Sequence, residues 1–599
     1  MKTLTKILDL LTLPERVRAG LLLGMILIMA LLDMIGVASI MPFMAVLANP
    51  QLLETNAFLS TAIHAFSALG ITTSEQFLFL LGSLVFVLLV VSQAFKALTA
   101  YAQTRFTLMR EYTIGKRLVE GYLYQPYSWF ISRHSADMGK MILSEVKEVI
   151  DKVIVHTMNL IAQSAVVIAL LTLLVLIDPI LALSVGAILI LAYVGIHKLM
   201  SSFLSRIGSE RVQANKERFT AVSEAFGAAK EVKVGGLEQA YINRFAIPAQ
   251  TYAKHQASAQ VVSQMPRFAL EAVAFGGLIL LVLMLMTRSG SFANALPIVA
   301  LYAFAAYRLM PALHQIYSAL TQLRFAGPAL DALHQDLMSL PPPPERTDHQ
   351  PTAMGLQHAI RLNKIQFSYP NTAQPALKNI SLRIPAHSTV GLVGATGSGK
   401  TTTVDLILGL LEAQQGTLEI DGQVINQANR RQWQRAIGYV PQQIYLADDT
   451  VAANIAFGVA TKDINTRAVE RAAKNASLHE FVMSDLPQQY QTKIGERGVR
   501  LSGGQRQRIG IARALYHNPK VLIFDEATSA LDNLTEESVM EAVRNLGNQI
   551  TIIMIAHRLS TVKECDTIFL LDNGVLKGVG DFEKLTQTNS LFLAMNSKR

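Results

Sequence analysis

The sequence predicts two parts in one chain: an all-α membrane domain with six spanning helices, followed by an α/β domain. Three observations predict this division. Long apolar runs fill the chain as far as Met310, and only the remainder has the mixed composition of an ordinary globular domain. Four consecutive prolines, Pro341–Pro344, separate the two patterns, because such a run cannot continue a helix. Beyond them, an apolar strand leads into a glycine-rich loop.

The composition favours a membrane protein. The chain has 599 residues, of which 51% are hydrophobic and 16% charged, whereas soluble domains carry about 25% charged residues. The net charge of +9 could indicate nucleic-acid binding, but basic cytoplasmic loops explain it as well, and no nucleic-acid motif accompanies it. Cys565 is the only cysteine, which excludes an intrachain disulfide and a cysteine-cluster metal site.

Six segments are apolar over about the 20 residues that a helix needs to cross a bilayer. They are Gly20–Leu47, Phe77–Tyr101, Leu160–Ile177, Ile180–Met200, Phe268–Met286 and Ala295–Ile316. No Lys or Arg occurs from Leu21 to Phe95, whereas basic residues precede the first span and follow the second and fourth. Because cytoplasmic loops are rich in Lys and Arg, both termini are expected in the cytoplasm.

The segments between these spans define the domain organisation. Ala102–Asn159 and Ser201–Pro266 are long, contain few helix breakers and are placed in the cytoplasm by the same charge rule. We therefore expect helices that continue well beyond the bilayer. The predicted boundaries are residues 1–335 for the membrane domain, 336–358 for a linker and 359–599 for the α/β domain.

The glycine-rich loop has the complete pattern of a phosphate-binding loop. The buried strand Val390–Val393 runs directly into Gly394-Ala395-Thr396-Gly397-Ser398-Gly399-Lys400-Thr401, at the start of a predicted helix. The glycines let backbone N–H groups surround phosphate oxygens, and the helix N-terminus favours anions. Lys400 is expected to reach the β- and γ-phosphates and Thr401 to offer its hydroxyl to Mg²⁺.

A second apolar strand ends in two carboxylates, Asp525 and Glu526. Many strands end in acids, so the pattern alone is weak. In an enzyme with a phosphate loop, the first carboxylate would hold Mg²⁺ through water and the second would polarise the attacking water.

Between these motifs lies Leu501-Ser502-Gly503-Gly504-Gln505, and here the chain resembles the ABC ATPase family. The resemblance implies that Tyr369 stacks on adenine, that Gln442 touches Mg²⁺ and faces the membrane domain, and that His557 lies at the γ-phosphate. It also identifies Ser529–Asp532 as the D-loop. The nucleotide-binding residues so predicted are Tyr369, Gly394, Ala395, Thr396, Gly397, Ser398, Gly399, Lys400, Thr401, Thr402, Ser502, Gly503, Gly504, Gln505 and Asp525. The predicted catalytic residues are Glu526, His557 and Gln442, and the predicted Mg²⁺ ligands are Thr401, Gln442 and Asp525, partly through water.

In this family the signature of one subunit closes on the ATP that the phosphate loop of the other subunit holds. Each chain carries one intact set of motifs, so the resemblance implies a homodimer, with a heterodimer as the open alternative. A membrane domain followed by an ATPase on one chain resembles exporters. We predict ATP and Mg²⁺ as cofactors and membrane lipids, not nucleic acid, as partners.

Three cations in or beside the spans are candidates for substrate binding: Lys96, Arg267 and Arg308. At ~1.5 Å per residue, Lys96 lies ~29 Å along the second span and Arg308 ~20 Å along the sixth. Arg267 opens the fifth span from the cytoplasm, so all three are expected in the inner half of the membrane. They could bind an anionic head group such as a phosphate. Alternatively, Asp33 and Glu271 could simply neutralise them, or the longer side chains could extend to the membrane surface.

Short motifs in the spans resemble the bacterial flippases of lipid-linked oligosaccharides. They are Met41-Pro42-Phe43, Met265-Pro266-Arg267 and Tyr307-Arg308-Leu309-Met310-Pro311, together with an amphipathic segment at Gln51–Gly70. The resemblance implies ATP-driven movement of a polyprenyl-pyrophosphate-linked glycan from the inner to the outer leaflet of the bacterial inner membrane. The alternatives are an exporter of another lipid, a drug or a peptide, and a soluble ABC ATPase, against which the six spans argue.

Overall fold

The structure is a computed structural model, and it describes residues 2–48, 73–177, 179–289, 292–341, 352–370, 372, 374–495, 498–526, 549–556 and 558–597. The chain divides into two compact units. The first comprises Met1–Gln125 and Trp129–Pro344, and the second comprises Glu345–Arg599 with the short segment Pro126–Ser128. The predicted amphipathic segment at 51–70 lies outside the described residues.

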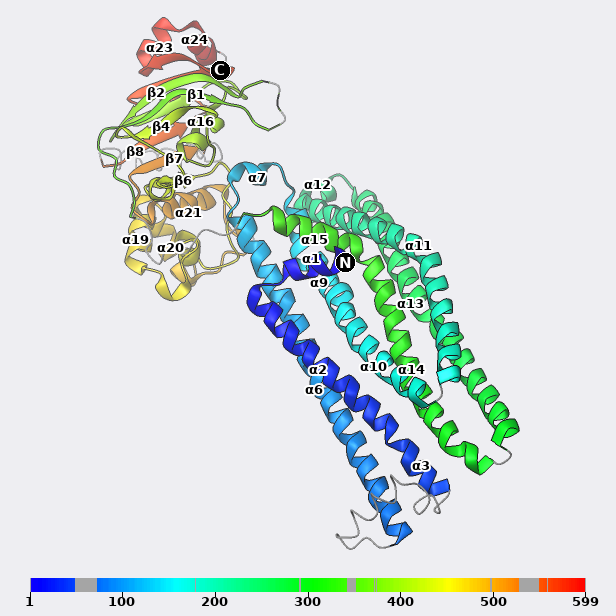
Figure 1. Cartoon of the computed structure of the whole chain (residues 1–599). Coiled ribbons are helices and arrows are strands. Elements are labelled where there is room, and N and C mark those ends of the chain that lie inside the picture. The colour runs from blue at the N-terminus through cyan, green and yellow to red at the C-terminus, as the bar shows by residue number, and fades with distance from the viewer. Residues whose placement is uncertain are drawn as a thin grey trace. The chain divides into compact units, whose positions relative to one another are not determined.

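Helices alone build the described part of the first unit (Figure 1). They are α1 (Lys2–Leu10), α2 (Leu13–Ala38), α3 (Ile40–Ala48), α6 (Ser74–Leu123), α7 (Tyr127–Ile131), α8 (Ser135–Lys140), α9 (Val146–Val149), α10 (Val155–Ile177), α11 (Pro179–Gly227), α12 (Ala229–Val234), α13 (Glu238–Ser289), α14 (Phe292–Phe325) and α15 (Gly327–Ser339). Two π-helical turns, η1 (Met141–Glu145) and η2 (Ile150–Ile154), lie between α8 and α10. The helices α6, α11 and α13 have 50, 49 and 52 residues, more than twice what a bilayer requires. They extend beyond the predicted spans, as the long intervening segments suggested.

The helix ends follow from local chemistry. Thr12 and Glu15 form a capping box at the start of α2, and Thr73 and Gln76 form another at α6. Pro179 is the first residue of α11. The backbone N–H at that position has no partner within a helix, so proline loses no hydrogen bond there. Buried apolar residues of α2, α10 and α14, such as Ile26 and Leu170, form one core of the bundle.

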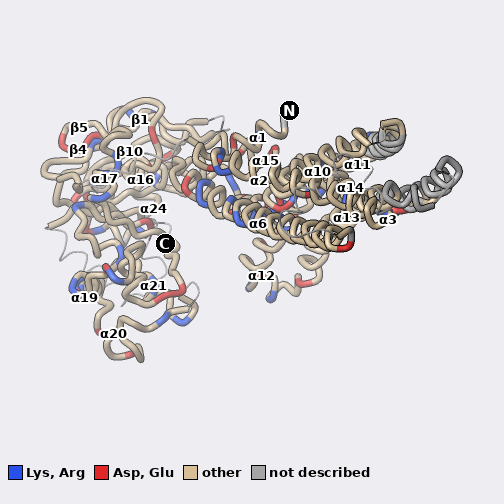
Figure 2. Tube along the Cα trace, turned by 60° about the horizontal axis from the view of Figure 1, so that its bottom comes forward, with Lys and Arg blue, Asp and Glu red and all other residues tan. Residues whose placement is uncertain are grey.

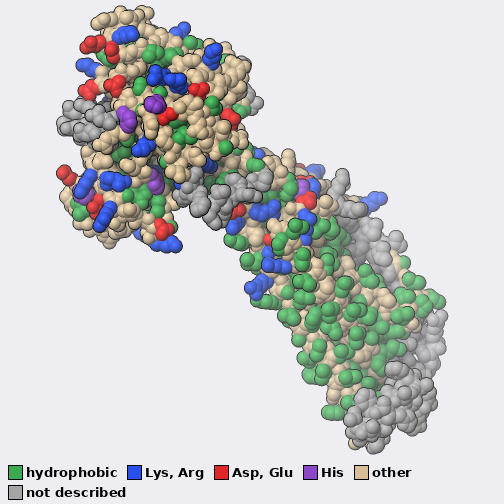
Figure 3. All heavy atoms as spheres, turned by 60° about the vertical axis from the view of Figure 1, so that its left-hand side comes forward, with side chains coloured by type: hydrophobic (Ala, Val, Ile, Leu, Met, Phe, Trp, Pro, Cys, Tyr) green, Lys and Arg blue, Asp and Glu red, His purple; other side chains and the backbone are tan. Residues whose placement is uncertain are grey.

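Among the described residues, three helical stretches are long and apolar enough to cross a membrane: Leu13–Leu47, Glu75–Leu123 and Ser135–Ile177. The other three predicted spans coincide with parts of α11, α13 and α14, where many side chains are not described. Hydrophobic side chains cover much of the visible face of this unit in Figure 3, as a surface facing lipid would require. In Figure 2, the Lys and Arg positions of α6 gather toward one end of that helix.

Two sheets form the second unit. The larger has the strand order β10-β9-β3-β8-β7-β6, and all neighbours except the antiparallel pair β10–β9 are parallel. Its strands are β3 (Thr389–Val393), β6 (Ile437–Val440), β7 (Val521–Asp525), β8 (Thr551–Ile555), β9 (Thr567–Asp572) and β10 (Val575–Gly580). The smaller, antiparallel sheet has the order β2-β1-β4-β5, from β1 (Ala359–Phe367), β2 (Leu377–Pro385), β4 (Gln415–Ile420) and β5 (Gln423–Val424).

Apolar strands explain why the larger sheet is central. Every residue of β7 and β8 is buried, as in a parallel sheet covered on both faces. The described helices of the unit are α16 (Lys400–Ile407), α17 (Arg430–Arg435), α18 (Val451–Ile455), α19 (Thr466–Asn475), α20 (His479–Ser484), α21 (Gly503–Leu515), α23 (Phe582–Thr588) and α24 (Ser590–Ser597), with 3₁₀ turns η3 (Thr461–Asp463), η4 (Gln489–Gln491) and η6 (Leu559–Val562). The loops at the carboxyl ends of β3, β6 and β7 meet at one edge, where ligands bind in open α/β sheets.

Candidate active site

The phosphate loop connects β3 to α16. Gly394, Gly397 and Gly399 have φ values of 152°, 80° and 101°, which L side chains rarely adopt. A Cβ atom on Gly394 would also lie 2.2 Å from the carbonyl oxygen of Leu571. The backbone therefore needs glycine here, and it places the loop at the N-terminus of an eight-residue helix.

Lys400, the first residue of α16, folds back over the loop. Its ammonium donates hydrogen bonds to the carbonyl oxygens of Gly394 (2.8 Å) and Ala395 (3.0 Å). Burial lowers the pKa of this ammonium, and the carboxylates of Glu526 and Asp525 oppose the shift. The positive charge thus lies within the concave loop, where it can bind a phosphate.

Tyr369 lies beside the first turn of the same helix. Its hydroxyl is 3.1 Å from the hydroxyl of Thr402, and its ring packs edge-on against Phe367 with centroids 5.0 Å apart. These contacts place a partly buried aromatic ring next to the phosphate loop.

Asp525 and Glu526 come from the end of β7. Tyr439, on the neighbouring strand β6, donates a hydrogen bond to Asp525 Oδ2 at 3.0 Å. Glu526 follows the strand with a φ of 50°, in the left-handed region, which is uncommon for a residue with a side chain. Gln442, just after β6, donates from Nε2 to Glu526 Oε2 at 2.7 Å.

Asp405, on α16, is a buried carboxyl group on which Asp525 acts. Burial, and then the charge of Asp525, raise the pKa of Asp405 to about 6. The charge of Asp525 therefore acts on both the carboxyl group of Asp405 and the ammonium of Lys400 in the phosphate loop.

The Leu501–Gln505 motif starts α21. Ser502 Oγ accepts a hydrogen bond from the backbone N–H of Gln505 (3.2 Å), and Gln505 Oε1 accepts one from the N–H of Ser502 (2.8 Å). This capping box fixes the start of a 13-residue helix whose first N–H groups can bind an anion. Gly503 and Gly504 lie in the first turn, and because glycine has no side chain a ligand can approach the backbone closely there.

A group of polar residues lies within the helical unit. The Asp33 carboxylate on α2 is 2% exposed and has two cations nearby, Lys96 Nζ on α6 and Arg308 Nη1 on α14, each at 3.8 Å. Ser92 donates a hydrogen bond to Asp33 Oδ1 at 2.9 Å. With its amide oxygen turned toward Arg308, Gln93 accepts a hydrogen bond from Arg308 Nη1 at 3.2 Å. We call Asp33, Ser92, Gln93, Lys96 and Arg308 the polar cluster.

Arg267 has a different partner. Its Nε donates to Glu271 Oε1 at 2.7 Å, one turn later on the same helix, α13. The structure thus joins two of the three predicted substrate cations around one carboxylate and pairs the third locally.

Comparison with known proteins identifies the fold and its family. The family model described as "ABC transporter transmembrane region" matches residues 28–316 of the sequence. The family model described as "ABC transporter" matches residues 377–529. An ATP-dependent lipid A-core flippase of Saccharophagus degradans is 32% identical over 483 residues, which cover 80% of each chain. The chain belongs to the ABC transporter family. Its membrane domain and ATPase together make it an ABC exporter, which couples ATP binding and hydrolysis to transport.

A further relative supports this assignment, and a solved structure has the same fold. The chloroplastic ABC transporter B family member 29 of Arabidopsis thaliana is 33% identical, over 74% of this ABC exporter and 69% of the plant protein. A solved structure of a bacterial Atm1-family ABC exporter with ATP bound has a TM-score of 0.75 at 24% identity and covers 97% of both chains. The structural likeness confirms the exporter fold predicted from the sequence.

Some predicted residues of this exporter lie outside the described part of the structure, namely His557 and the segment Ser529–Asp532. Other contributors were not predicted. Tyr439 is one of them, because its hydrogen bond to Asp525 depends on β6 and β7 lying side by side. Ser92 and Gln93 precede Lys96 by one helical turn, and polar residues within an apolar span are a usable signal.

Proposed function

We propose that this exporter is an ATP-driven flippase that moves an anionic, lipid-linked oligosaccharide from the inner to the outer leaflet of a bacterial inner membrane. The polyprenyl-pyrophosphate group would be the anionic part of the substrate. Residues 1–335 would form the transmembrane domain, 336–358 the linker and 359–599 the nucleotide-binding domain, with both termini in the cytoplasm. Two identical chains would form the working unit.

The polar cluster is the observation that carries this proposal. Lys96 and Arg308 together hold two positive charges, and Asp33 supplies a single negative charge between them. A charge inside a membrane costs roughly 2.5–3.5 kcal/mol, so a cation in excess is retained where it faces a partner or a cavity. A phosphate oxygen is a suitable partner for both a guanidinium and an ammonium. Asp33 also holds the two cations in place between substrate molecules.

The nucleotide site supplies the driving force. In the proposed roles, Lys400 and the loop N–H groups bind the phosphates, Tyr369 stacks on the adenine and Glu526 accepts a proton from the attacking water. Thr401, Asp525 and Gln442 offer the oxygen ligands that Mg²⁺ prefers, partly through water, and the ion would neutralise phosphate charge during transfer. His557 would contact the γ-phosphate. Ser502–Gln505 of one copy would close on the nucleotide held by the other.

A second substrate has a specific observation in its favour. Relatives from Saccharophagus degradans and Cupriavidus pinatubonensis, 32% and 31% identical, are lipid A-core flippases. Lipid A-core and a polyprenyl-pyrophosphate glycan share the chemistry that the polar cluster would recognise, a phosphate close to both sugar and hydrocarbon. The two substrates differ in the number and shape of their acyl or prenyl chains.

The test is transport in proteoliposomes. The reconstituted protein would receive, in separate samples, a labelled polyprenyl-pyrophosphate glycan, labelled lipid A-core and a neutral glycolipid, and accessibility of the label would report its leaflet. We expect ATP-dependent movement of the first substrate and little of the neutral lipid. Faster movement of lipid A-core would assign the second function instead. Equal movement of the neutral lipid would remove the role of the anionic group.

A further inference from the structure

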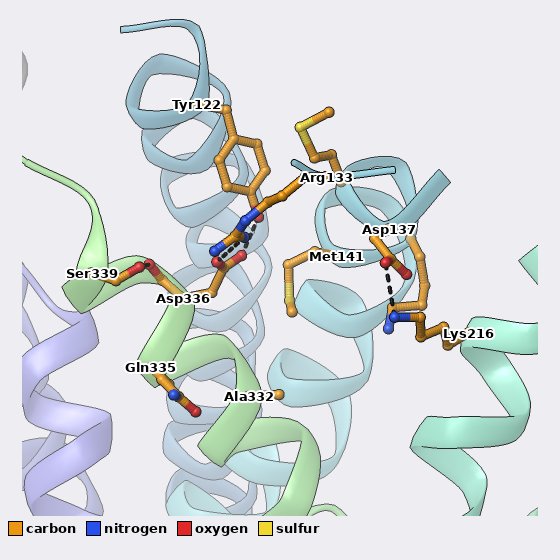
Figure 4. Close-up of a pocket in the computed structure, with 11 residues that line it drawn as sticks. Tyr122, Arg133, Asp137, Met141, Lys216, Ala332, Gln335, Asp336 and Ser339 are labelled. Carbon is orange, nitrogen blue, oxygen red and sulfur yellow. Dashed lines mark hydrogen bonds and ion pairs between the residues drawn. The ribbon is translucent and has the colours of Figure 1, made fainter. Parts of the chain in front are cut away.

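A cavity of about 350 Å³ lies in the helical unit, and none of its lining residues belongs to the polar cluster. Its walls come from α6, α8, η1, α11 and α15, which are far apart in the sequence. Figure 4 shows Ala332, Gln335 and Asp336 extending from α15, and Asp137 and Lys216 on another side of the cavity. The cavity is at the lower end of the size range of small-molecule sites, and it is several times larger than the space one water molecule occupies.

Two ion pairs in the wall neutralise their own charges. Arg133 Nη1 lies 2.9 Å from Asp336 Oδ1, and the hydroxyl of Tyr122 donates a hydrogen bond to Oδ2 of the same carboxylate. Lys216 Nζ lies 3.0 Å from Asp137 Oδ2. Each carboxylate that lines the cavity thus has a cation beside it (Figure 4).

Lys140 is the exception. It ends α8, lines the cavity and is only 7% exposed, and within the described part of the chain its side chain has no hydrogen-bond or ion-pair partner. The described wall therefore contains three cations and two carboxylates, which leaves one positive charge without a counter-ion. An anion bound in the cavity would supply the missing counter-ion.

The rest of the wall indicates what kind of anion would fit. Met138, Met141 and Ala332 contribute apolar surface, and Gln335 and Ser339 contribute neutral polar groups. We propose that this cavity is a binding site for a small organic anion with a single negative charge and an apolar body, held by the ammonium of Lys140. Such a site is separate from both the nucleotide and the transported lipid.

Benzoate is a suitable probe, because it combines one carboxylate with an apolar ring, and benzamide is its neutral counterpart of the same shape. The full-length protein in detergent and without nucleotide would be titrated with each compound, with binding measured by calorimetry and by the shift of the thermal unfolding midpoint. We expect benzoate to bind and to raise the midpoint, and benzamide to do neither. Equal binding of both compounds, or of neither, would overturn the proposal.

Two variants locate the site. Lys140→Met nearly keeps the length of the side chain and removes its charge. We expect benzoate affinity to fall by about ten- to a hundredfold, which corresponds to the free energy of one hydrogen bond to a charged group. Lys147→Met, at an exposed position of α9 outside the cavity, is the matched control and should bind as the wild type does. Unchanged affinity in Lys140→Met would refute the role of Lys140.

The stability of the variants provides an independent measurement. Because Lys140→Met removes a positive charge that has no counter-ion in the described part of the wall, its unfolding midpoint without benzoate should be at or above that of the wild type. If that variant does not fold, Ala332→Leu offers a second test, since it fills the cavity without altering a charge. Benzoate binding at wild-type strength in Ala332→Leu would place the ligand elsewhere and contradict the proposal.

Discussion

Gln442 Nε2 lies 2.7 Å from Glu526 Oε2, so the glutamine after β6 holds the carboxylate after β7 directly. The two residues are 84 positions apart in the sequence, and the parallel pairing of their strands brings them together. Glu526 itself has a φ of 50°, a conformation that the surrounding structure must impose. The carboxylate is therefore fixed at a defined place at the edge of the sheet.

Glu526→Gln should retain ATP binding and lose hydrolysis. The amide has nearly the same shape, but it cannot accept a proton from water, and general bases contribute about 10²–10⁴-fold to a rate. Phosphate release and nucleotide binding by the purified protein measure the two effects. Glu583→Gln, at an exposed position of α23, is the control. Turnover near the normal rate in Glu526→Gln would exclude Glu526 as the base.

Tyr439→Phe tests a residue that acts through Asp525. The substitution removes the hydroxyl that donates to Asp525 Oδ2 and leaves the ring in place. Loss of such a partner typically weakens metal binding about tenfold or more. We expect a higher Mg²⁺ concentration for half-maximal ATPase activity, with a smaller change in the rate at saturating Mg²⁺. An unchanged Mg²⁺ dependence would show that the phenol does not position a metal ligand.

Cys565 should be inert in the folded protein. Burial, and then the neighbouring charges of Asp566 and Glu564, raise the pKa of its thiol to about 12, so the reactive thiolate is scarce from pH 7 to pH 9. We expect negligible maleimide labelling of the native chain and complete labelling after denaturation. Ser590→Cys in a Cys565→Ala background provides an exposed thiol as the control. Rapid labelling of the native wild type would contradict the assigned burial.

The sequence was sufficient to predict the motifs and their order, because the chemistry of each is local. The Gly394–Thr401 loop needs positive φ angles and a helix start, and both are visible in the spacing of the glycines. The Tyr439–Asp525 contact was not predictable in this way. It depends on β6 and β7 lying side by side, which the sequence does not specify without the fold.

The helical unit shows the same limit. Apolar length predicted the helices, and positive-inside reasoning predicted their direction. The sequence left open whether Asp33 neutralises the cations or the cations bind substrate, because this depends on the rotation of α2, α6 and α14 about their axes. The structure turns Asp33, Lys96 and Arg308 toward one another. The remaining positive charge keeps a substrate role open to experiment.

Arg211 and Glu145 form a pair that should be essential for stability. Both side chains are 0% exposed, Arg211 Nη2 lies 3.0 Å from Glu145 Oε2, and Asn215 donates to the other carboxylate oxygen at 2.7 Å. Glu145→Ala would leave the guanidinium buried without its counter-ion, which typically costs about 3–5 kcal/mol. A lower thermal midpoint in detergent would show this, and adding Arg211→Met should recover much of the loss. No change in Glu145→Ala would mean that the pair contributes little.

Arg308→Gln and Arg267→Gln separate a substrate cation from a structural one. Arg308 lies beside Asp33 and Lys96, so its loss removes the excess charge of the polar cluster and leaves Asp33 neutralised by Lys96. Arg267 is paired with Glu271 on its own helix, so its loss should affect transport less. We expect Arg308→Gln to lower transport of the pyrophosphate-linked glycan by at least about tenfold, equivalent to ~1.4 kcal/mol, while ATP hydrolysis without substrate continues. The same loss in both variants would mean that a cation at either place serves equally, and the polar cluster would then have no special role in recognising the lipid.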